Sequence, residues 1–508
     1  MSTLTGKQTS FWIDSTPKTS YPVLENSISV DVAIVGAGIV GLSAATQLKR
    51  AGKTVAVIES REIVTGVTGN TTAKITSLHQ LIYADLIKEI GEQKAQLYAE
   101  SNQAGIEYIA QLVEQEKIDC DFSRQSAYTF AEPDGELDKI KDEVNAALKL
   151  GLSATLVQET SLPFAISGAI KLDYQAQFHV RKYLLHLAKS ILGNGSHIFE
   201  NTRVQKVDEK DNLCQVVTNR GIIDAQDVIV ATNLPILDQG LFFFAKTYPK
   251  RSYIIGAMID PAKAPQGMYI GSGKNSHSIR TTPHEGGLLL LVGGEGHKVG
   301  TVNDTKELYQ NLETYARNQF GIDSFAYRWS NQDMVSFDKL PFIGKLTPFN
   351  NHIYVATGFS LWGMSKGAMA GMLLSDLVLG KDNPYADLYD ATRATPFLDP
   401  KLIKSNIEVA SRWVGDRLKG IQHSSFAEVT KGEGKLITID DEKVAAYRDE
   451  EGKVHAVSAV CPHLACIVSW NNAEKSWDCA CHGSRFGCDG KLIQGPAVKD
   501  LEKILDEG

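Results

Sequence analysis

The sequence predicts an α/β chain that ends in a small all-β unit, and three observations carry this prediction. Residues 31–59 form a short apolar strand, a glycine turn, a helix over about 39–51 and a second apolar strand. After Gly420 the pattern changes to short strands separated by glycine-rich turns, which is typical of a β unit. Between these ends, helical spacing of apolar residues fills 80–118. Strand-like runs recur at 126–131, 227–233, 252–259, 286–294 and 351–359.

Length and composition limit the possible classes of protein. The chain has 508 residues, of which 43% are apolar and 22% charged, and a net charge of −8. This length fits two or three domains, and the acidic balance argues against nucleic acid or an anionic membrane surface as the main partner. Residues 1–22 lack the pattern of a signal peptide, and no stretch is apolar enough to predict a membrane span. We therefore expect a cytoplasmic protein whose polar leader, residues 1–29, lies over the first domain.

Three glycines follow the first strand directly and open the helix. Gly36, Gly38 and Gly41 form the pattern G-x-G-x-x-G, which lets the backbone approach a pyrophosphate at the helix N-terminus. Glu59 ends the second strand, where a carboxylate can accept hydrogen bonds from ribose hydroxyls. The sequence therefore predicts a dinucleotide site, with a turn required only for packing as the alternative.

This unit resembles the start of the FAD-dependent amine and amino-acid oxidoreductases, such as D-amino-acid dehydrogenase, glycine oxidase and sarcosine oxidase. The hydroxyl-rich loop GVTGNTTAKIT and the stretch FDKLPFIGKLTPFNNHIYVATGFSLWGMSKGAMAGMLLSDLV resemble two further parts of that family. The resemblance covers roughly residues 30–385 and implies FAD as the cofactor. The residues that it implies for FAD binding are Gly36, Ala37, Gly38, Ile39, Val40, Gly41, Glu59, Ser60, Arg61, Thr68, Thr71, Thr72, Ala73, Lys74, Val204, Ala231, Thr232, Gly344, Gly358, Phe359, Gly363 and Met364.

The resemblance also implies how the chain divides. It places a Rossmann-like FAD-binding domain at about 30–80, 195–235 and 335–385, and a mixed-sheet substrate domain at about 81–194 and 236–334. An amphipathic run then predicts a helical linker over 386–420. No second G-x-G-x-x-G follows a strand, so we expect no separate NADH domain. Neither Cys120 nor Cys214 resembles a site of covalent flavin attachment, so we expect FAD to be held noncovalently.

The β unit at 421–508 carries a dense group of cysteines and histidines. Cys461-x-His463 and Cys479-x-x-His482 supply two sulfur and two nitrogen ligands, which could serve a structural zinc site. The spacing Cys-x-His is tight for zinc. The two halves resemble instead the Rieske [2Fe–2S] pattern, in which two cysteines bind one iron and two histidines bind the other.

The Rieske resemblance implies further features of this unit. Cys466 and Cys481 stand where some members form a disulfide between the ligand loops, although such a bond conflicts with a reducing cytoplasm. Ser484 is expected to hydrogen-bond a cluster sulfur. Phe486 replaces the tyrosine of high-potential members, so we expect a lower reduction potential. Residues 495–497 resemble the proline loop that covers the cluster.

The tandem arrangement resembles bacterial FAD-dependent oxidoreductases with a C-terminal Rieske domain. It implies a dehydrogenase that oxidises an amine or amino-acid-like substrate and passes electrons from flavin to the cluster and then to an external acceptor. One alternative is an electron-transfer protein that receives electrons from a protein or a reduced carrier and has no small-molecule substrate of its own. A Rieske oxygenase is a third, but His179 and His186 lack an obvious third iron ligand. Candidate substrate-site residues are His79, Arg251, Tyr253, Arg280 and Trp362, of which an Arg/Tyr pair could hold a carboxylate.

Overall fold

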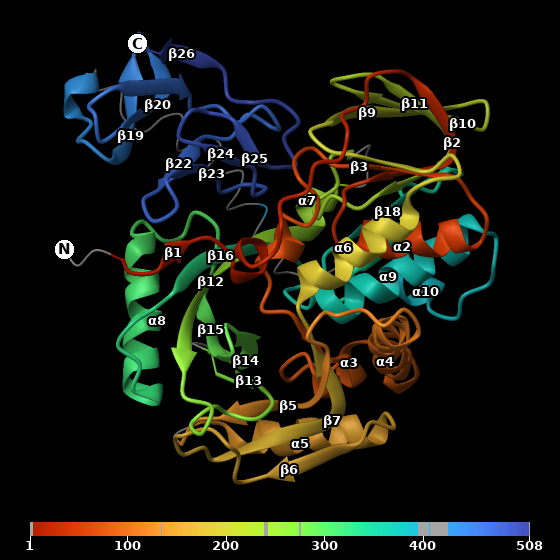
Figure 1. The fold of residues 1–508 in the computed structure, drawn as a ribbon, viewed down its shortest axis with the longest axis vertical. Helices are drawn as coiled ribbons and strands as arrows, with labels where there is room; N and C mark the ends of the chain where they lie inside the picture. The colour runs from red at the N-terminus through yellow and green to blue at the C-terminus, as the bar shows by residue number, and fades with distance from the viewer. Residues whose placement is uncertain are drawn as a thin grey trace.

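Two large sheets and two small ones organise the chain (Figure 1). The structure, a computed structural model, describes residues 4–133, 135–237, 242–273, 276–394, 406 and 425–506. The helices are α1 (Phe11–Asp14), α2 (Ile39–Arg50), α3 (Tyr83–Ile90), α4 (Glu92–Gln115), α5 (Leu137–Lys149), α6 (Val180–Ile191), α7 (Phe243–Lys246), α8 (Thr305–Phe320), α9 (Gly363–Val378) and α10 (Ala386–Tyr389), with single 3-10 turns η1 (Val67–Asn70) and η3 (Phe426–Glu428).

An eight-stranded, largely parallel sheet carries the glycine turn. Its main path is β17-β18-β11-β2-β3-β8, and the hairpin β9–β10 extends β11. These strands are β2 (Ile28–Val35), β3 (Val55–Ile58), β8 (His197–Phe199), β9 (Val204–Lys210), β10 (Leu213–Thr218), β11 (Ile222–Val230), β17 (Phe342–Lys345) and β18 (Ile353–Thr357). Strand β3 is fully buried, which explains its unbroken apolar run. The carboxyl ends of β2, β3 and β11 meet at one edge, the usual ligand-binding edge of such a sheet.

Helices α2 and α9 pack closely against each other. A Cβ on Gly367 of α9 would lie 2.6 Å from a side-chain carbon of Ile39, and one on Gly371 would lie 2.6 Å from Ser43. The bare glycines therefore let the two helices approach. As a result, the amino ends of α2 and α9, which both follow glycine-rich turns, open toward the same region.

A ten-stranded mixed sheet forms the other half of the main body. Its main path is β1-β16-β12-β15-β14-β13-β5-β7-β4, with β6 added beside β7. The strands are β1 (Lys7–Gln8), β4 (Lys74–Ile75), β5 (Ser123–Ala131), β6 (Ala154–Val157), β7 (Gly168–Gln177), β12 (Thr247–Ile259), β13 (Met268–Gly271), β14 (Ser278–His284), β15 (Gly287–Lys298) and β16 (Tyr327–Ser336). Helix α8 covers one face of β12 and β15 (Figure 1).

The amino-terminal segment departs from its expected place. Strand β1 pairs in parallel with β16, so the segment joins the ten-stranded sheet rather than only covering the first domain. Phe11 and Trp12 are buried, and Trp12 donates its indole N–H to the Thr71 carbonyl at 2.6 Å. A two-residue edge strand leaves no periodic signal in the sequence, which explains why the pairing was not predicted.

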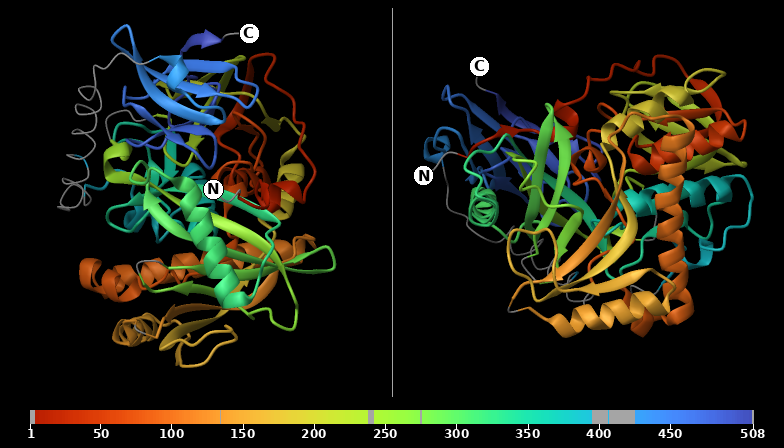
Figure 2. Two further views of the ribbon diagram at one scale, coloured as in Figure 1. Left: turned by 90° about the vertical axis from the view of Figure 1, so that its left-hand side faces the viewer. Right: turned by 60° about the horizontal axis from the view of Figure 1, so that its bottom comes forward.

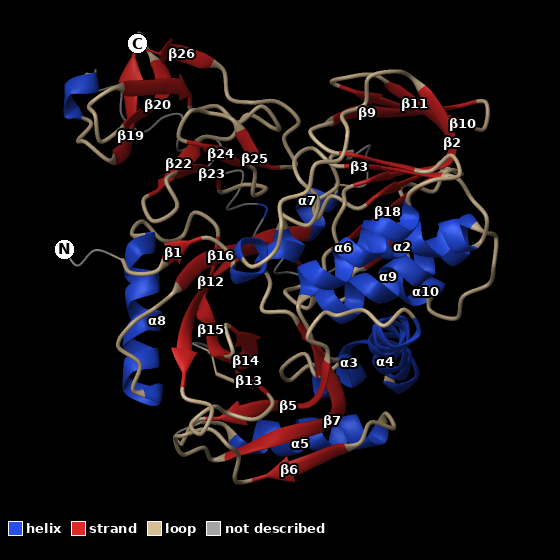
Figure 3. Cartoon of the chain, in the orientation of Figure 1, coloured by secondary structure: helices blue, strands red, loops and turns tan. Residues whose placement is uncertain are grey.

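The C-terminal unit consists of short strands joined by loops, with one helical turn at its start (Figure 3). One antiparallel sheet runs β19-β20-β21-β26 and the other β22-β23-β24-β25. The strands are β19 (Glu433–Ile439), β20 (Glu442–Arg448), β21 (Val454–Ser458), β22 (Val468–Asn471), β23 (Ser476–Cys479), β24 (Arg485–Gly487), β25 (Leu492–Gln494) and β26 (Lys503–Asp506). Most of the helical linker predicted over 386–420 lies outside the described residues; within the described part, 386–389 is helical.

The C-terminal unit sits directly on the main body, above β1, β12 and β16 in Figure 1, and the turned views of Figure 2 also place it beside these strands. Hydrogen bonds join the two parts at several points. Thr305 donates its hydroxyl to Asn471 Oδ1 at 2.7 Å, and Tyr309 donates to Glu474 Oε1 at 2.7 Å. Among the described helices, none is both long and apolar enough to cross a bilayer.

We predict that Gly41→Ala lowers stability sharply. The added Cβ would lie 2.0 Å from the Gly36 carbonyl oxygen, so helix α2 or the glycine turn must shift. Overpacking of this kind costs about 1–3 kcal/mol or more of unfolding free energy, measurable by urea denaturation. Gly273→Ala is the matched control, because its Cβ meets no atom within 4 Å. Equal stability of the two variants would contradict the prediction.

Candidate functional site

A long cavity follows the carboxyl edge of the eight-stranded sheet. It runs from the ends of β2, β3 and β11 past the loop at 66–72 to the start of α9. Most of the residues expected to bind FAD line it: Gly36, Ala37, Gly38, Ile39, Val40, Glu59, Ser60, Arg61, Thr68, Thr71, Thr72, Val204, Ala231, Thr232, Phe359, Gly363 and Met364. We call this space the long cavity.

The glycine turn is built for close approach by a ligand. Gly36 has φ +104°, and a Cβ there would lie 2.6 Å from the Ala231 carbonyl oxygen, so only glycine fits. Helix α2 begins with Gly38 as its N-cap, which has no side chain to cap the helix, and among the first N–H groups that of Ile39 donates to the Thr68 hydroxyl at 3.2 Å. Its amino end therefore faces the cavity with backbone donors that suit a pyrophosphate. Together with Glu59 on the cavity wall, these features fit the FAD that the sequence implies.

Five residues of the expected set do not line the long cavity: Lys74 lines a second cavity, described below, and the other four have the following positions. Gly41 abuts the Gly36 carbonyl, and Gly344 and Gly358 adopt positive φ angles of 144° and 77° beside neighbouring chain segments. Ala73 is buried, with its carbonyl accepting from Arg280 at 2.7 Å. Among the described lining residues of the long cavity these four do not occur, so the structure gives them a role in shaping the turns.

A second cavity adjoins the first at the start of α9. Both are lined by Ser252, Ile254 and Met364, whereas only the second also includes Lys74, Lys250, Glu295, His297 and Trp362. We call it the side cavity. Burial lowers the pKa of Lys74 to about 7, and its ammonium donates to the Tyr269 carbonyl at 2.7 Å. Burial also lowers the pKa of Lys250.

Of the five substrate-site candidates, only Trp362 lines a cavity among the described residues. Arg251 instead forms an ion pair with Asp478 of the C-terminal unit, Nη1 to Oδ2 2.7 Å, and the two side chains are only 1% and 7% exposed. Tyr253 is buried beside it, with its ring edge-to-face to Tyr309 of α8 at 4.8 Å. The structure thus corrects the proposed Arg/Tyr carboxylate clamp.

The pleat of β12 and β16 explains why Arg251 faces the C-terminal unit rather than the cavity. Successive side chains of a strand point to opposite faces of a sheet. On one face Ser252 and its partner Asn331 line the long cavity. On the other face Arg251 pairs with Gln332 and faces the C-terminal unit. A difference of one position therefore decides between the cavity and the interface.

His79 and Arg280 also serve structural contacts. His79 is buried, with Nδ1 2.6 Å from the Tyr98 hydroxyl and its ring stacked at a tilt on Trp362 at 4.9 Å. Arg280 donates to the Thr72 and Ala73 carbonyls at 3.1 and 2.7 Å. It therefore holds the hydroxyl-rich loop rather than a substrate, and burial lowers its pKa to about 9.

Two buried titratable groups near the start of α9, Asp333 and Lys366, had no signal in the sequence. Asp333 lines the long cavity and accepts from the Leu361 and Met334 N–H groups at 2.7 and 2.9 Å. Burial raises the pKa of Asp333 to about 6. Lys366 donates to the Phe359 carbonyl at 3.1 Å, and burial lowers its pKa to about 7. The two side chains fix the turn that leads into α9.

The four expected metal ligands converge in the C-terminal unit. Cys461 and Cys479 are buried, and a hydrogen bond between their thiols lowers the pKa of Cys461 to about 7. His463 and His482 turn their Nδ1 atoms to within 3.3 Å of each other. Burial lowers their pKa values to about 4 and about 3, so both rings are neutral near pH 7, as metal ligation requires. Paired thiols beside paired imidazoles fit the donor set of a Rieske cluster.

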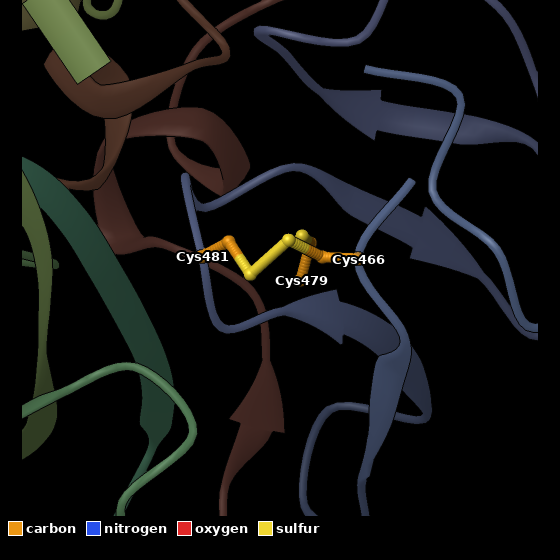
Figure 4. Close-up of side chains that lie close together, drawn as sticks. All are labelled: Cys466, Cys479 and Cys481. Carbon is orange, nitrogen blue, oxygen red and sulfur yellow. A yellow bond between two sulfur atoms is a disulfide. The ribbon is translucent and has the colours of Figure 1, made fainter. Parts of the chain in front are cut away.

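A disulfide joins the two ligand loops. Cys466 and Cys481 are bonded at 2.13 Å, and the sulfur of Cys479 lies beside them (Figure 4). The sulfurs of these three residues lie within 4.8 Å of one another. Because two of them are consumed by the disulfide, only Cys479 of this trio can ligate a metal as a thiolate.

The ligand loops face the main body. The ring of His482 lies edge-to-face on Phe244, with the ring centres 4.8 Å apart. Gly483, the next residue, accepts a hydrogen bond of 2.7 Å from the Gln332 side-chain amide. A Cβ on Gly483 would lie 2.8 Å from Pro249, so glycine is needed for this contact.

Comparison with known proteins agrees with both halves of the site. The model of the family described as FAD dependent oxidoreductase matches residues 31–377, and the Rieske [2Fe-2S] domain model matches residues 422–504. The chain is an FAD-dependent oxidoreductase with a C-terminal Rieske domain. Its cofactors are FAD and a [2Fe–2S] cluster, as the sequence predicted.

Individual relatives extend the match. A Bacillus subtilis protein named as the Rieske 2Fe-2S iron-sulfur protein YhfW is 37% identical over 97% of both chains. Gamma-glutamylputrescine oxidoreductase of Escherichia coli is 24% identical over 74% of this chain and 89% of its own. The crystal structure of glycine oxidase from Geobacillus kaustophilus shares the fold, with a TM-score of 0.61, 20% identity and coverage of 72% of this chain and 99% of that one.

We predict that Cys479→Ser abolishes the EPR signal of the reduced Rieske cluster, because a serine hydroxyl does not replace a thiolate ligand of iron. Cys488→Ser is the matched control, since Cys488 lies in the same unit outside the four-ligand set. Iron content and EPR are measured on both variants. Loss of the signal in the control, with retention in Cys479→Ser, would contradict the ligand assignment.

We predict that Arg251→Met destabilises the protein by up to about 3–5 kcal/mol, because it removes the nearer cation from the buried Asp478 carboxylate and leaves only Arg485, at 3.3 Å, to compensate it. Burial tends to raise the pKa of Asp478, but Arg251 and Arg485 outweigh it and hold the pKa at about 2, so the carboxylate is charged near neutral pH. Thermal unfolding measures the effect. Lys339→Met, at a more exposed pair, serves as the control.

Adding Asp478→Asn to Arg251→Met should restore part of the stability, since a neutral amide needs no cation. A stable Arg251→Met variant that had only lost affinity for a carboxylate substrate would instead support the earlier substrate role of Arg251.

Proposed function

We propose that the chain is a dehydrogenase that oxidises an amine or amino-acid-like substrate in the side cavity and sends the electrons through the sheet to the Rieske cluster, from which an external acceptor takes them. The observation that carries this proposal is the position of β12 and β16. Their one face lines the flavin cavity, and their other face contacts the C-terminal unit next to cluster ligand His482.

Strand β16 connects the cavity wall to a cluster loop. Asn331 and Asp333 lie on the cavity wall, and Gln332 between them donates to the Gly483 carbonyl. The path from cavity to cluster loop is thus one strand and one hydrogen bond. The buried Arg251–Asp478 pair holds the same contact, with Arg251 also donating to Gln332 Oε1 at 2.9 Å.

The residues of the side cavity suit the oxidation of an amine by FAD. When bound, FAD would supply the acceptor for a hydride from a substrate carbon next to nitrogen and would pass the two electrons on singly, since a [2Fe–2S] cluster carries one at a time. The substrate also loses its nitrogen proton and becomes an imine. Glu295 and His297 on the wall of the side cavity are the groups placed to accept that proton. Burial lowers the pKa of His297, which keeps its ring neutral and able to accept.

The lining of the side cavity supports a charged amine substrate. Lys74 and Lys250 offer cationic groups for a carboxylate, and Glu295 offers an anion for an ammonium group. The names glycine oxidase and gamma-glutamylputrescine oxidoreductase, borne by proteins similar to this chain, support the same class. We propose the domain limits 30–385, 386–420 and 421–508 for these functions; the two family matches fall within the first and third.

The experiment that tests the function mixes anaerobic protein with amines, N-methyl amino acids and D- and L-amino acids, and follows flavin absorbance and then cluster EPR. We expect one class to bleach the flavin, followed by a reduced Rieske signal. If no compound bleaches the flavin but a reduced carrier reduces the cluster, the chain is an electron-transfer protein without a small-molecule substrate of its own.

We predict that Gln332→Leu slows reduction of the cluster several-fold while flavin reduction keeps its wild-type rate. The variant removes the hydrogen bond to Gly483 from the face of β16 that lies away from the cavity. Stopped-flow absorbance resolves the two steps. Thr305→Val is the matched control, because it breaks an interdomain hydrogen bond to Asn471, outside the ligand loops. Equal slowing in both variants would show a general loss of docking rather than a path through Gln332.

A further inference from the structure

A short segment of the C-terminal unit lines the long cavity of the main body. Its lining residues are Leu492, Ile493, Gln494, Gly495, Ala497 and Val498. They belong to β25 and the turn after it, and residues 495–497 of that turn resemble the proline loop of Rieske domains. We call residues 492–498 the cavity flap. The glycine turn and the flap, which are more than 450 positions apart in sequence, therefore border one cavity.

Asp500 holds one end of the cavity flap through two contacts. Asp500 accepts from the Leu492 N–H at 2.9 Å, which closes the turn. The same carboxylate oxygen accepts from Arg203 Nη1 at 3.2 Å. Arg203 itself lines the long cavity next to Val204, so Asp500 connects the flap residue Leu492 to a lining residue of the main body.

The middle of the flap is held from behind. Ala497 donates its N–H to the Ser484 hydroxyl at 3.0 Å, and both residues are buried. Gly495 packs against Ile236, and a Cβ there would lie 3.7 Å from its side chain. Ser484 lies two residues after the cluster ligand His482. The flap therefore contacts the cluster loop through Ala497 and also lines the long cavity.

We propose that the cavity flap is part of the FAD site, so that the C-terminal unit completes the dinucleotide pocket as well as carrying the cluster. Leu492, Ile493 and Val498 supply apolar surface to a bound dinucleotide, and Gly495 lets the backbone approach it. Burying apolar surface of the ligand against these side chains favours binding. This inference depends on the FAD site alone and holds whether or not electrons flow from flavin to cluster.

The test measures FAD affinity in the full-length chain after the flavin has been removed. Ile493→Glu and Val498→Glu each place a carboxylate on the cavity wall, where it repels the pyrophosphate and removes apolar contact. We expect each to raise the Kd for FAD at least tenfold, read by flavin fluorescence, while the Rieske EPR signal stays at the wild-type level. Lys499→Gln is the matched control: it makes the same change in charge one position outside the lining, at an exposed residue. A Kd within twofold of wild type in both glutamate variants would overturn the proposal.

A measurement on the unmodified chain keeps the proposal testable if the glutamate variants lose their cluster. Hydrogen exchange is compared between flavin-free and FAD-loaded protein, both with the cluster in place. We expect backbone amides of 492–498 to exchange more slowly when FAD is bound, along with those of the glycine turn. Slower exchange in the glycine turn with no change in 492–498 would show that the dinucleotide site ends at the main body.

Discussion

The alternation of side chains along β12 and β16 is the constraint on which the arrangement of the two cofactor sites depends. Paired residues Ser252 and Asn331 face the long cavity, and the adjoining pair Arg251 and Gln332 faces the Rieske unit. Two strands therefore serve as the wall of one site and the platform of the other. A shift of register by one residue would move every one of these side chains to the wrong face.

Buried charge fixes the Rieske unit on that platform. Arg251 and Asp478 lie almost fully out of solvent, and Asp478 immediately precedes cluster ligand Cys479 in the chain. Such a pair is costly to separate, because Arg251 would lose its buried carboxylate partner and Asp478 would keep only Arg485. The contacts of Gln332 with Gly483 and of Arg203 with Asp500 extend the same interface. We infer a docked domain whose position relative to the flavin cavity is part of the proposed electron path.

Local patterns allowed much of this protein to be predicted from its sequence. The glycine turn, Glu59 and the Cys/His spacing lie within short stretches, so a dinucleotide site and a metal site could be predicted from nearby residues. The resemblance of these stretches to known families then implied FAD and the Rieske cluster, which the family matches confirm. The expected position of Arg251 in the substrate site was wrong. The face of the sheet on which a side chain lies, and the unit that packs against that face, depend on tertiary structure. The buried acid Asp333 and the cavity flap depend on contacts between segments distant in sequence, which composition and spacing do not encode.

The central claim is that electrons cross from the flavin cavity to the cluster within one chain. The most direct measurement follows cluster reduction after anaerobic reduction of the flavin, at protein concentrations spanning a hundredfold. Transfer within one docked chain predicts a first-order rate that does not change with protein concentration. A rate that rises in proportion to concentration, or a flavin that stays reduced beside an oxidised cluster, would contradict the account.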